Sequence, residues 1–364
     1  MFATSWLCSH SRPAAALVIT TCIVLAGPIA ANAQTTTAVK TIATGNAPLA
    51  VVMSIDSRFV YVTEYGAGAV GVIDTGTNKL VDQIQVGSQP YSLVMTPDGK
   101  RLYVANSGSG TVSVVETQTN RHQPDIYIGP AASPSFLAIT SDGRKVLVSS
   151  VYGGNITFID VKTNRVLPYP IDSSPLILGF LGCPEGIATV PGAKRAIAYL
   201  NTQCTGTTGV SGHDPVFVID TEYERIVGVI GFSNHPNVGS GIAVSPDGKT
   251  VWVSGANACS AIGYDHQGCP ADRGDPVTVI DTTRNTIKTQ FFLGGPSFIS
   301  FTPDSRYVYL ATSSGIVVID AERYRVVRTL PILGSTGSVA FTADGRFAYT
   351  PIMGRNVVAV VRTD

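Results

Sequence analysis

The chain has 364 residues, and its 25 Lys and Arg balance 25 Asp and Glu, so the formal charge is zero. A neutral chain lacks the basic excess of proteins that bind nucleic acid or anionic membranes, so no nucleic-acid partner is expected. Only 14% of residues are charged and 44% are hydrophobic, which excludes an intrinsically disordered chain. The 37 glycines and 22 prolines disfavour long helices and predict many turns.

The first 33 residues are predicted to be a cleaved export signal. Residues 14–26 form an almost unbroken apolar run, and the A-x-A sequence Ala31-Asn32-Ala33 follows. A short apolar run ending in such a site is typical of a secretory signal. The alternative is a membrane anchor, which needs about 20 apolar residues. We therefore expect residues 34–364 to be exported, to the periplasm or outside the cell, with no membrane span.

A repeated unit fills residues 34–364. A hydrophobic triplet ending in an acid recurs at Asp74, Glu116, Asp160, Asp220, Asp281 and Asp320, with a degenerate copy before Arg362. Upstream of each triplet lies a turn sequence such as TPDG (96–99), followed by a short apolar strand such as RLYVAN (101–106). In such a turn Pro fixes φ, Asp bonds the turn backbone and Gly supplies φ > 0, so the chain reverses. Four short antiparallel strands in about 42 residues predict one blade of a β-propeller.

A second turn in the unit contains Asn, a residue that tolerates the left-handed conformation. It occurs at Asn78, Asn120, Asn164 and Asn285. The repeated acids are interpreted as caps of this turn rather than as catalytic carboxylates, because they would be dispersed around a ring. Residues 38–45 match a fourth strand such as residues 80–87, so they are predicted to complete the last blade and close the ring. The fold prediction is therefore all-β: one seven-bladed β-propeller domain over residues 34–364, with four antiparallel strands in each blade.

The repeat resembles a known family. The sequence RLYVANSGSGTVSVVETQTN (101–120) is similar to the YVTN-type β-propeller repeat, whose signature appears as YVTE at 61–64, YVAN at 103–106 and YLAT at 309–312. The resemblance implies a seven-bladed propeller, usually exported, related in shape to lactonases, quinoprotein dehydrogenase subunits and haem-d1 nitrite reductases. The chain departs from the cofactor-bearing relatives, because it has no C-x-x-C-H haem attachment sequence and no Cys/Trp pair recognisable as a quinone precursor.

The regular spacing fails in blades four and five, where we predict the binding face. Insertions run from Asn201 to Asp214 and from Gly255 to Asp275, and a longer connection covers residues 173–184. In propellers these segments share one face, and long loops on a rigid scaffold are the usual seat of binding. The candidate contacts are Glu185, His213, Asp214, His235, Tyr264, Asp265 and His266.

The four cysteines beyond the export signal lie in the same segments. An even number of cysteines in an exported chain favours disulfides. Of three connectivities, we prefer Cys183–Cys204 and Cys259–Cys269, because each would close an insertion within one blade. Free buried thiols are the alternative.

Three functions compete. The first is a monomeric binding scaffold for a protein or a cell-envelope component. The second is a lactonase-like or metal-assisted hydrolase on the same face, and the third is a purely structural envelope protein. No cofactor is predicted, although a divalent metal could be held by residues of the mouth: His213, Asp214, His235, Asp265, His266, Asp272 and Asp275. Their spacing is not that of a tight metal motif. Glu185, on a channel-lining first strand, and Glu64, at the end of a second strand, are the acids that a hydrolase would use.

Overall fold

The computed structural model describes residues 40–129, 132–168, 184–192, 197–202, 215–232, 241–255, 275–293, 297–312, 315–332 and 334–363. The chain divides into two units, Met1–Ala33 and Gln34–Asp364, and every described residue belongs to the second. The export signal therefore stays a prediction. Within the described ranges, no helix long and apolar enough to cross a membrane occurs.

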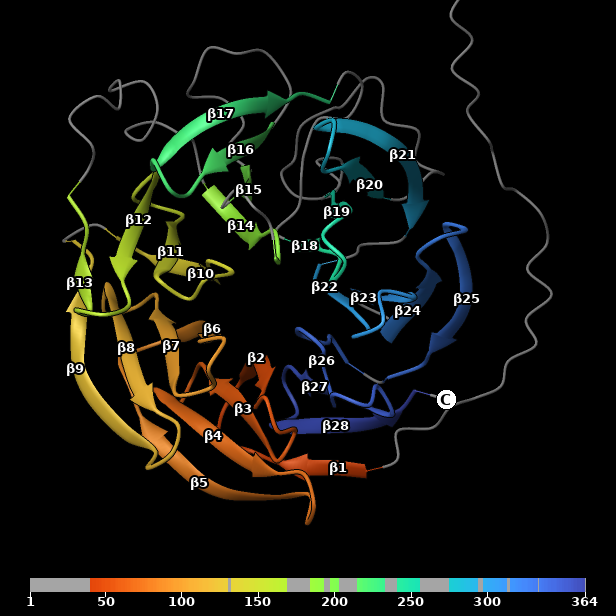
Figure 1. The fold of residues 1–364 in the computed structure, drawn as a ribbon. Helices are drawn as coiled ribbons and strands as arrows, with labels where there is room; N and C mark the ends of the chain where they lie inside the picture. The colour runs from red at the N-terminus through yellow and green to blue at the C-terminus, as the bar shows by residue number, and fades with distance from the viewer. Residues whose placement is uncertain are drawn as a thin grey trace, which may run out of the picture. The chain divides into compact units, whose positions relative to one another are not determined.

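The second unit is a ring of seven four-stranded antiparallel sheets (Figure 1). Blade 1 is β2 (Pro48–Met53), β3 (Phe59–Glu64), β4 (Ala69–Asp74) and β5 (Lys79–Gln85). Blade 2 is β6 (Pro90–Met95), β7 (Arg101–Asn106), β8 (Thr111–Glu116) and β9 (Arg121–Tyr127). Blade 3 is β10 (Pro134–Ile139), β11 (Lys145–Ser150), β12 (Asn155–Asp160) and β13 (Arg165–Val166).

The remaining blades follow in the same order around the ring. Blade 4 is β14 (Pro184–Thr189), β15 (Ile197–Thr202), β16 (Val216–Asp220) and β17 (Arg225–Ile230). Blade 5 is β18 (Ile242–Val244), β19 (Thr250–Ser254), β20 (Asp275–Asp281) and β21 (Thr286–Leu293). Blade 6 is β22 (Ile299–Phe301), β23 (Tyr307–Thr312), β24 (Gly315–Asp320) and β25 (Arg325–Leu330). Blade 7 is β26 (Ala340–Phe341), β27 (Phe347–Ile352), β28 (Val357–Arg362) and β1 (Lys40–Ala43).

Ring closure occurs as predicted. The N-terminal strand β1 is the outermost strand of blade 7 and pairs antiparallel with β28, with Lys40 opposite Val360 and Ala43 opposite Val357. Ile42 of β1 is buried in a cluster that also holds residues of blades 1 and 7. A fourth strand from the far end of the chain thus removes the open edge of the last blade.

The turn chemistry of the sequence is confirmed. Gly99 of the TPDG turn has φ 70° and the Asn of each second turn, such as Asn164, has φ 53°. The Oδ1 of Asp160 accepts hydrogen bonds at 2.7 Å from both the backbone N–H and the hydroxyl of Thr163. These turn bonds lower the pKa of Asp160. The repeated acids therefore cap turns, because their oxygens are engaged by the backbone that follows them.

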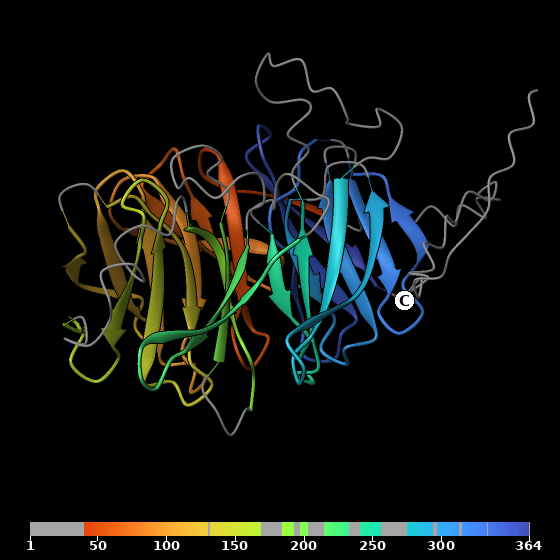
Figure 2. The same cartoon turned by 90° about the horizontal axis from the view of Figure 1, so that it is seen from above.

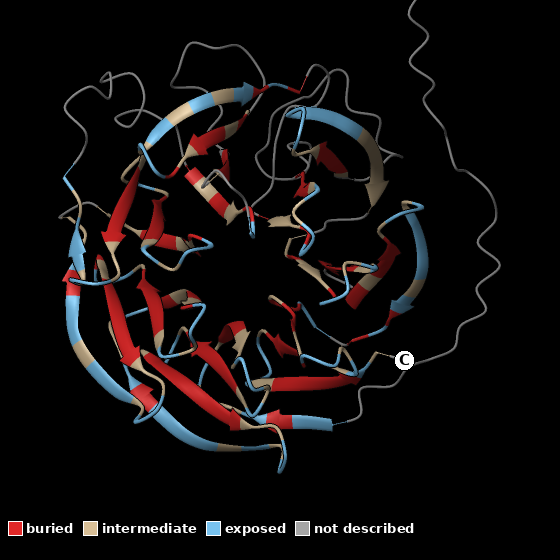
Figure 3. Ribbon diagram, viewed as in Figure 1, coloured by how far each residue is buried: buried red, intermediate tan, exposed pale blue. Residues whose placement is uncertain are grey.

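Apolar side chains between the blades form the core. In Figure 3 the two middle strands of each blade are largely buried, whereas the outermost strands are largely exposed. The third residue of each second strand is fully buried between neighbouring blades: Tyr61, Tyr103, Leu147, Tyr199, Trp252, Tyr309 and Tyr349. Because each described cluster of buried residues joins two neighbouring blades, the core is a ring of inter-blade layers.

Candidate functional site

The structure describes few of the site residues that were predicted from the sequence. Glu185 lies in β14, and Asp275 begins β20. The other nominated contacts and possible metal ligands lie outside the described residues: His213, Asp214, His235, Tyr264, Asp265, His266 and Asp272. Cys183, Cys204, Cys259 and Cys269 lie outside them too. The two disulfides and the metal site therefore stay predictions. Among the residues that are described, no group of three or more His, Cys, Asp or Glu could hold a metal ion.

One face of the ring carries both the connections that enter the blades and the loops between second and third strands. The repeat predicted that these two kinds of connection share a face. In blade 1 the N–H of Tyr65, after the second strand, donates to the carbonyl of Ala47, in the connection that enters the blade, at 2.9 Å. In blade 2 Ser107 makes the equivalent bond to Gln89 at 3.0 Å. Figure 2 shows the strands running between this face and the opposite one. We call it the loop face; the insertions of blades 4 and 5 begin there, after β15 and β19.

Glu185 lies at the loop-face end of an innermost strand. It is the second residue of β14, directly after Pro184, and its side chain is half-buried. The buried hydroxyl of Ser149, in the neighbouring blade 3, donates to the backbone carbonyl of Glu185 at 2.6 Å. This bond fixes the backbone from which the carboxylate projects, so the rest of the ring determines its position.

An aromatic row lies at the same end of the inner strands in blades 1 to 3. Tyr91 occupies in β6 the position that Glu185 occupies in β14, directly after the opening proline. Its ring packs edge-to-face against Phe136 of β10 with centroids 5.2 Å apart, and against Tyr65 at 6.4 Å. Burial raises the pKa of Tyr91 to about 12, and the charges of Glu185 and Tyr65 add to the rise. We define the axis site as Tyr65, Tyr91, Phe136 and Glu185.

Glu64, the second acid proposed for a hydrolase, has a different environment. It lies at the loop-face end of β3 but is 0% exposed. One carboxylate oxygen accepts from the N–H of Gly45 at 2.7 Å, and the other accepts from the side-chain amide of Gln83 at 2.8 Å. Glu64 therefore fastens the segment after β1 to blade 1, and it has no exposed oxygen to offer a substrate.

Tyr65, Tyr91 and Phe136 were not among the candidate contacts predicted from the sequence. The signal was present, because Tyr91 and Phe136 lie in the first strands of successive repeats and Tyr65 directly follows YVTE. Aromatic residues in short apolar strands are ordinarily read as core. Only the packing of three blades around one axis places these rings together.

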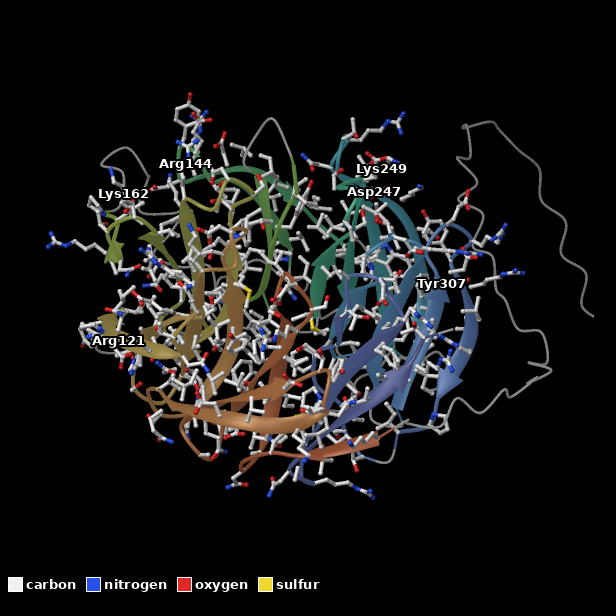
Figure 4. All side chains as sticks on the ribbon, turned by 60° about the horizontal axis from the view of Figure 1, so that its bottom comes forward. Arg121, Arg144, Lys162, Asp247, Lys249 and Tyr307 are labelled. Carbon is white, nitrogen blue, oxygen red and sulfur yellow. The ribbon has the colours of Figure 1, made fainter. Side chains whose placement is uncertain are left out.

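The basic side chains that the structure describes gather in no single stripe. Arg121, Arg144, Lys162 and Lys249, labelled in Figure 4, are spread over the blades that carry them. Arg144 and Lys249 pair with the aspartates of their own turns, Asp142 at 2.7 Å and Asp247 at 3.0 Å. Such exposed local pairs belong to a solvated surface and contribute little to stability.

The geometry defines the class of protein, a seven-bladed β-propeller with four antiparallel strands per blade, and comparisons with known proteins agree. Residues 24–126 match the family model described as lactonase, 7-bladed beta-propeller. A solved structure described as Kuenenia stuttgartiensis hydrazine synthase is 23% identical, with a TM-score of 0.72 over 87% of this chain and 96% of that one. That identity shows the fold alone. No curated protein matches the sequence. The predicted resemblance to a seven-bladed propeller family is thus confirmed.

Proposed function

We propose that this protein is a binding protein that takes its partner at the axis site and over the adjoining loop face. The observation that carries the proposal is the aromatic row Tyr65–Tyr91–Phe136 with Glu185 beside it. Aromatic rings are enriched where proteins contact partners, because they offer a large surface at a small cost in conformational entropy. The ring of blades holds these side chains in place, so little ordering is needed on contact.

The chemistry of the axis site favours an apolar group that carries a positive charge. The faces of Tyr and Phe rings attract cations by about 0.5–2 kcal/mol each, and the Glu185 carboxylate adds an opposite charge beside them. The partner in this proposal is an exported protein or an envelope component that presents a Lys, Arg or alkylammonium group. The propeller itself is proposed to act as an exported monomer. His213, Asp214, His235, Tyr264, Asp265 and His266 are proposed to extend the surface and lie outside the described residues.

Saturation-transfer NMR with tetramethylammonium tests the cation claim, with tert-butanol as a neutral probe of similar shape. We expect the purified protein to bind the cation in preference to the alcohol. Tyr91→Ala and Glu185→Gln should each weaken binding about tenfold. Tyr223→Ala is the control, since Tyr223 is exposed in a turn at the opposite face. Equal binding of both probes, or equal effects of all three substitutions, would contradict the proposal.

A second candidate function is hydrolysis of a lactone, favoured by the family-model match over residues 24–126. In this alternative Glu185 would act as a base at the axis site, and residues in the loops of blades 4 and 5 would hold a divalent metal. The test is turnover of a series of lactones with Zn²⁺, Mn²⁺ or Ca²⁺ added. Turnover that Glu185→Gln reduces at least a hundredfold would favour the enzyme. Absence of turnover with every metal would leave the binding function.

A further inference from the structure

Neighbouring blades are fastened by one recurring contact on the face opposite the loop face. The buried Tyr of a second strand donates from its hydroxyl to the Asn in the turn between the third and fourth strands of the next blade. Tyr103 of blade 2 reaches Asn164 of blade 3 at 2.6 Å. Tyr199 reaches Asn285 at 2.5 Å, and Tyr349 of blade 7 reaches Asn78 of blade 1 at 3.2 Å.

In three further interfaces, other interactions take the place of the Tyr–Asn hydrogen bond. Tyr61 donates to the carbonyl of Thr117, in the corresponding turn of blade 2, at 3.4 Å. In blade 3, where Leu147 replaces the Tyr, Lys145 pairs with Glu224 of the blade 4 turn at 2.7 Å. In blade 5 the Trp252 ring packs on the ring of Tyr324, in the blade 6 turn, with centroids 5.9 Å apart. In six interfaces, therefore, the turn between the third and fourth strands of one blade contacts the second strand of the blade before it.

The interface between blades 6 and 7 lacks such a turn. The third and fourth strands of blade 7 are β28 and β1, which are not consecutive in the chain, so no tight turn joins them. A cavity of about 480 Å³ lies here. Its lining includes Asp304, Tyr307, Tyr309, Asp344, Arg346 and Thr363. Tyr307, labelled in Figure 4, lies on β23 of blade 6. We call this cavity the seam pocket; it is large enough for a small ligand or the tip of a peptide.

A buried hydroxyl in the seam pocket has an unused donor. Tyr309 is 1% exposed and occupies the position of Tyr103 and Tyr199. Its oxygen accepts from Arg328 at 2.8 Å, and Arg328 also donates to the carbonyl of Thr363. Among the described residues, none accepts the proton of the Tyr309 hydroxyl, whereas Tyr103 and Tyr199 each give theirs to an Asn. A buried donor without an acceptor costs about 1–3 kcal/mol.

The charges at the seam pocket also point to a ligand. Asp304 and Asp344 each engage one carboxylate oxygen in the local turn. Neither forms an ion pair within the described ranges, unlike Asp142 and Asp247 in blades 3 and 5. A cation next to the bound group would therefore meet two carboxylates and one guanidinium, that of Arg346, on the pocket wall, so the negative charge exceeds the positive there. In the chain's own turns a Lys or Arg directly follows the Asn at Lys79, Arg121 and Arg165.

We propose that the seam pocket binds an Asn-bearing turn of a partner polypeptide, with a basic residue directly after the Asn. The Tyr309 hydroxyl donates to the Asn side-chain oxygen, and Asp304 and Asp344 attract the basic residue. The bound turn thus takes the place that the chain's own turns take in the other interfaces. The seam pocket is separate from the axis site, and this proposal does not rest on the function proposed there.

The chain supplies the probe for the test. An acetylated and amidated peptide with the sequence of residues 74–80, DTGTNKL, reproduces the turn that Tyr349 meets. We expect saturation-transfer NMR to show it binding to the full protein. A peptide with Leu at the position of Asn78 should bind about three- to tenfold more weakly, which corresponds to one hydrogen bond. Tyr309→Phe should weaken binding of the original peptide by the same factor and leave the Leu peptide unaffected.

Controls separate the seam pocket from other sites. Tyr103→Phe makes the same change in an occupied interface and should leave binding unchanged. The weakening caused by Tyr309→Phe should persist in the Glu185→Gln background, which distinguishes the seam pocket from the axis site. Urea unfolding of Tyr309→Phe verifies that the variant is folded. No binding at millimolar peptide, equal binding of the two peptides, or insensitivity to Tyr309→Phe would each overturn the proposal.

Discussion

The interfaces between blades 2 and 3 and between blades 6 and 7 place a tyrosine at the same position of similar second strands, RLYVAN and YVYLAT, but the two tyrosines have different partners. In the first, Tyr103 meets Asn164 in a turn that continues from β12 to β13. In the second, Tyr309 occupies the equivalent place, but the strands it faces come from opposite ends of the ring's sequence, and Arg328 bridges to Thr363 instead. The repeat therefore specifies one half of each contact, and the connectivity of the neighbouring blade decides whether the other half exists.

Ring closure supplies blade 7 with its fourth strand, β1, but not with the tight turn that joins the third and fourth strands of the other blades. Ile42 of β1 is 4% exposed, close to Ile84 of β5 and Ile126 of β9 at 6% and 7%. The sheet of blade 7 is thus packed like those of blades 1 and 2. Hydrogen bonds and apolar contacts along a strand need only the strand, whereas a turn needs a continuous chain. The seam pocket and the unused donor of the Tyr309 hydroxyl both follow from that difference.

The largest effect expected is alkaline unfolding of the whole ring. Burial raises the pKa of Tyr61 and of Tyr199 from 10.0 to about 12. A phenol whose folded pKa exceeds its unfolded value stabilises the fold fully below the unfolded value and loses that contribution as pH rises through the folded one. Stability should therefore fall between about pH 10 and 12. Circular dichroism together with phenolate absorbance measures it, and Tyr199→Phe should weaken the pH dependence. Ionisation of these tyrosines near pH 10 in the folded protein would contradict their burial.

The next largest effect tests whether β1 is a full member of blade 7. Ile42→Ala should reduce the free energy of unfolding by about 2–5 kcal/mol, because it leaves a cavity in a packed cluster. Ile84→Ala is the matched control in an uninterrupted blade. Urea denaturation of both should give losses within about 1 kcal/mol of each other. A much smaller loss for Ile42→Ala would show that β1 frays from the ring.

Glu64→Gln tests the fastening of the segment after β1 to blade 1. The new amide would turn a donor towards either the Gly45 N–H or the Gln83 amide, so we expect a loss of about 1–3 kcal/mol. The double substitution Glu64→Gln with Gln83→Glu restores a donor–acceptor pair and should recover most of the loss. Glu116→Gln, at a partly exposed strand end, is the control. If Glu64→Gln changed partner binding without changing stability, the structural role would be wrong.

The smallest effect compares the two kinds of interface directly. Tyr103→Phe removes a hydrogen bond to Asn164 and should cost about 0.5–1.5 kcal/mol. Tyr309→Phe removes only the acceptor of Arg328, which keeps its bond to Thr363, so we expect a smaller loss. Thermal unfolding of both variants measures the difference. A larger loss for Tyr309→Phe would mean that its hydroxyl has a partner as good as Asn164.

Much of the fold could be predicted because its determinants are local. The Pro-Asp-Gly and Thr-x-Thr-Asn turns need only the conformational preferences of their own residues, and Gly99 and Asn164 have the predicted positive φ. The capping role of Asp160 was predictable for the same reason, since its partners lie three residues away. Ring closure could be predicted because residues 38–45 repeat the pattern of a fourth strand.

The candidate site was less predictable because its determinants are not local. Glu64 and Glu185 are both acids at the ends of apolar strands, and both were predicted from the sequence as acids that a hydrolase would use. Packing separates them: Gly45 and Gln83 enclose Glu64, whereas Glu185 lies beside an aromatic row drawn from three other blades. The loop residues nominated in blades 4 and 5 stay predictions.

The sequence by itself therefore determined the repeat, its turns, the strand order within a blade and the strand that closes the ring, because each depends on residues close together in the chain or on a repeated pattern. Only the tertiary structure decided which side chains meet across blades. It brought Tyr65, Tyr91 and Phe136 together at the axis, buried Glu64, and left Tyr309 beside a cavity. The physical reason is that these contacts join residues whose proximity is set by the closed ring, and no local preference encodes that distance.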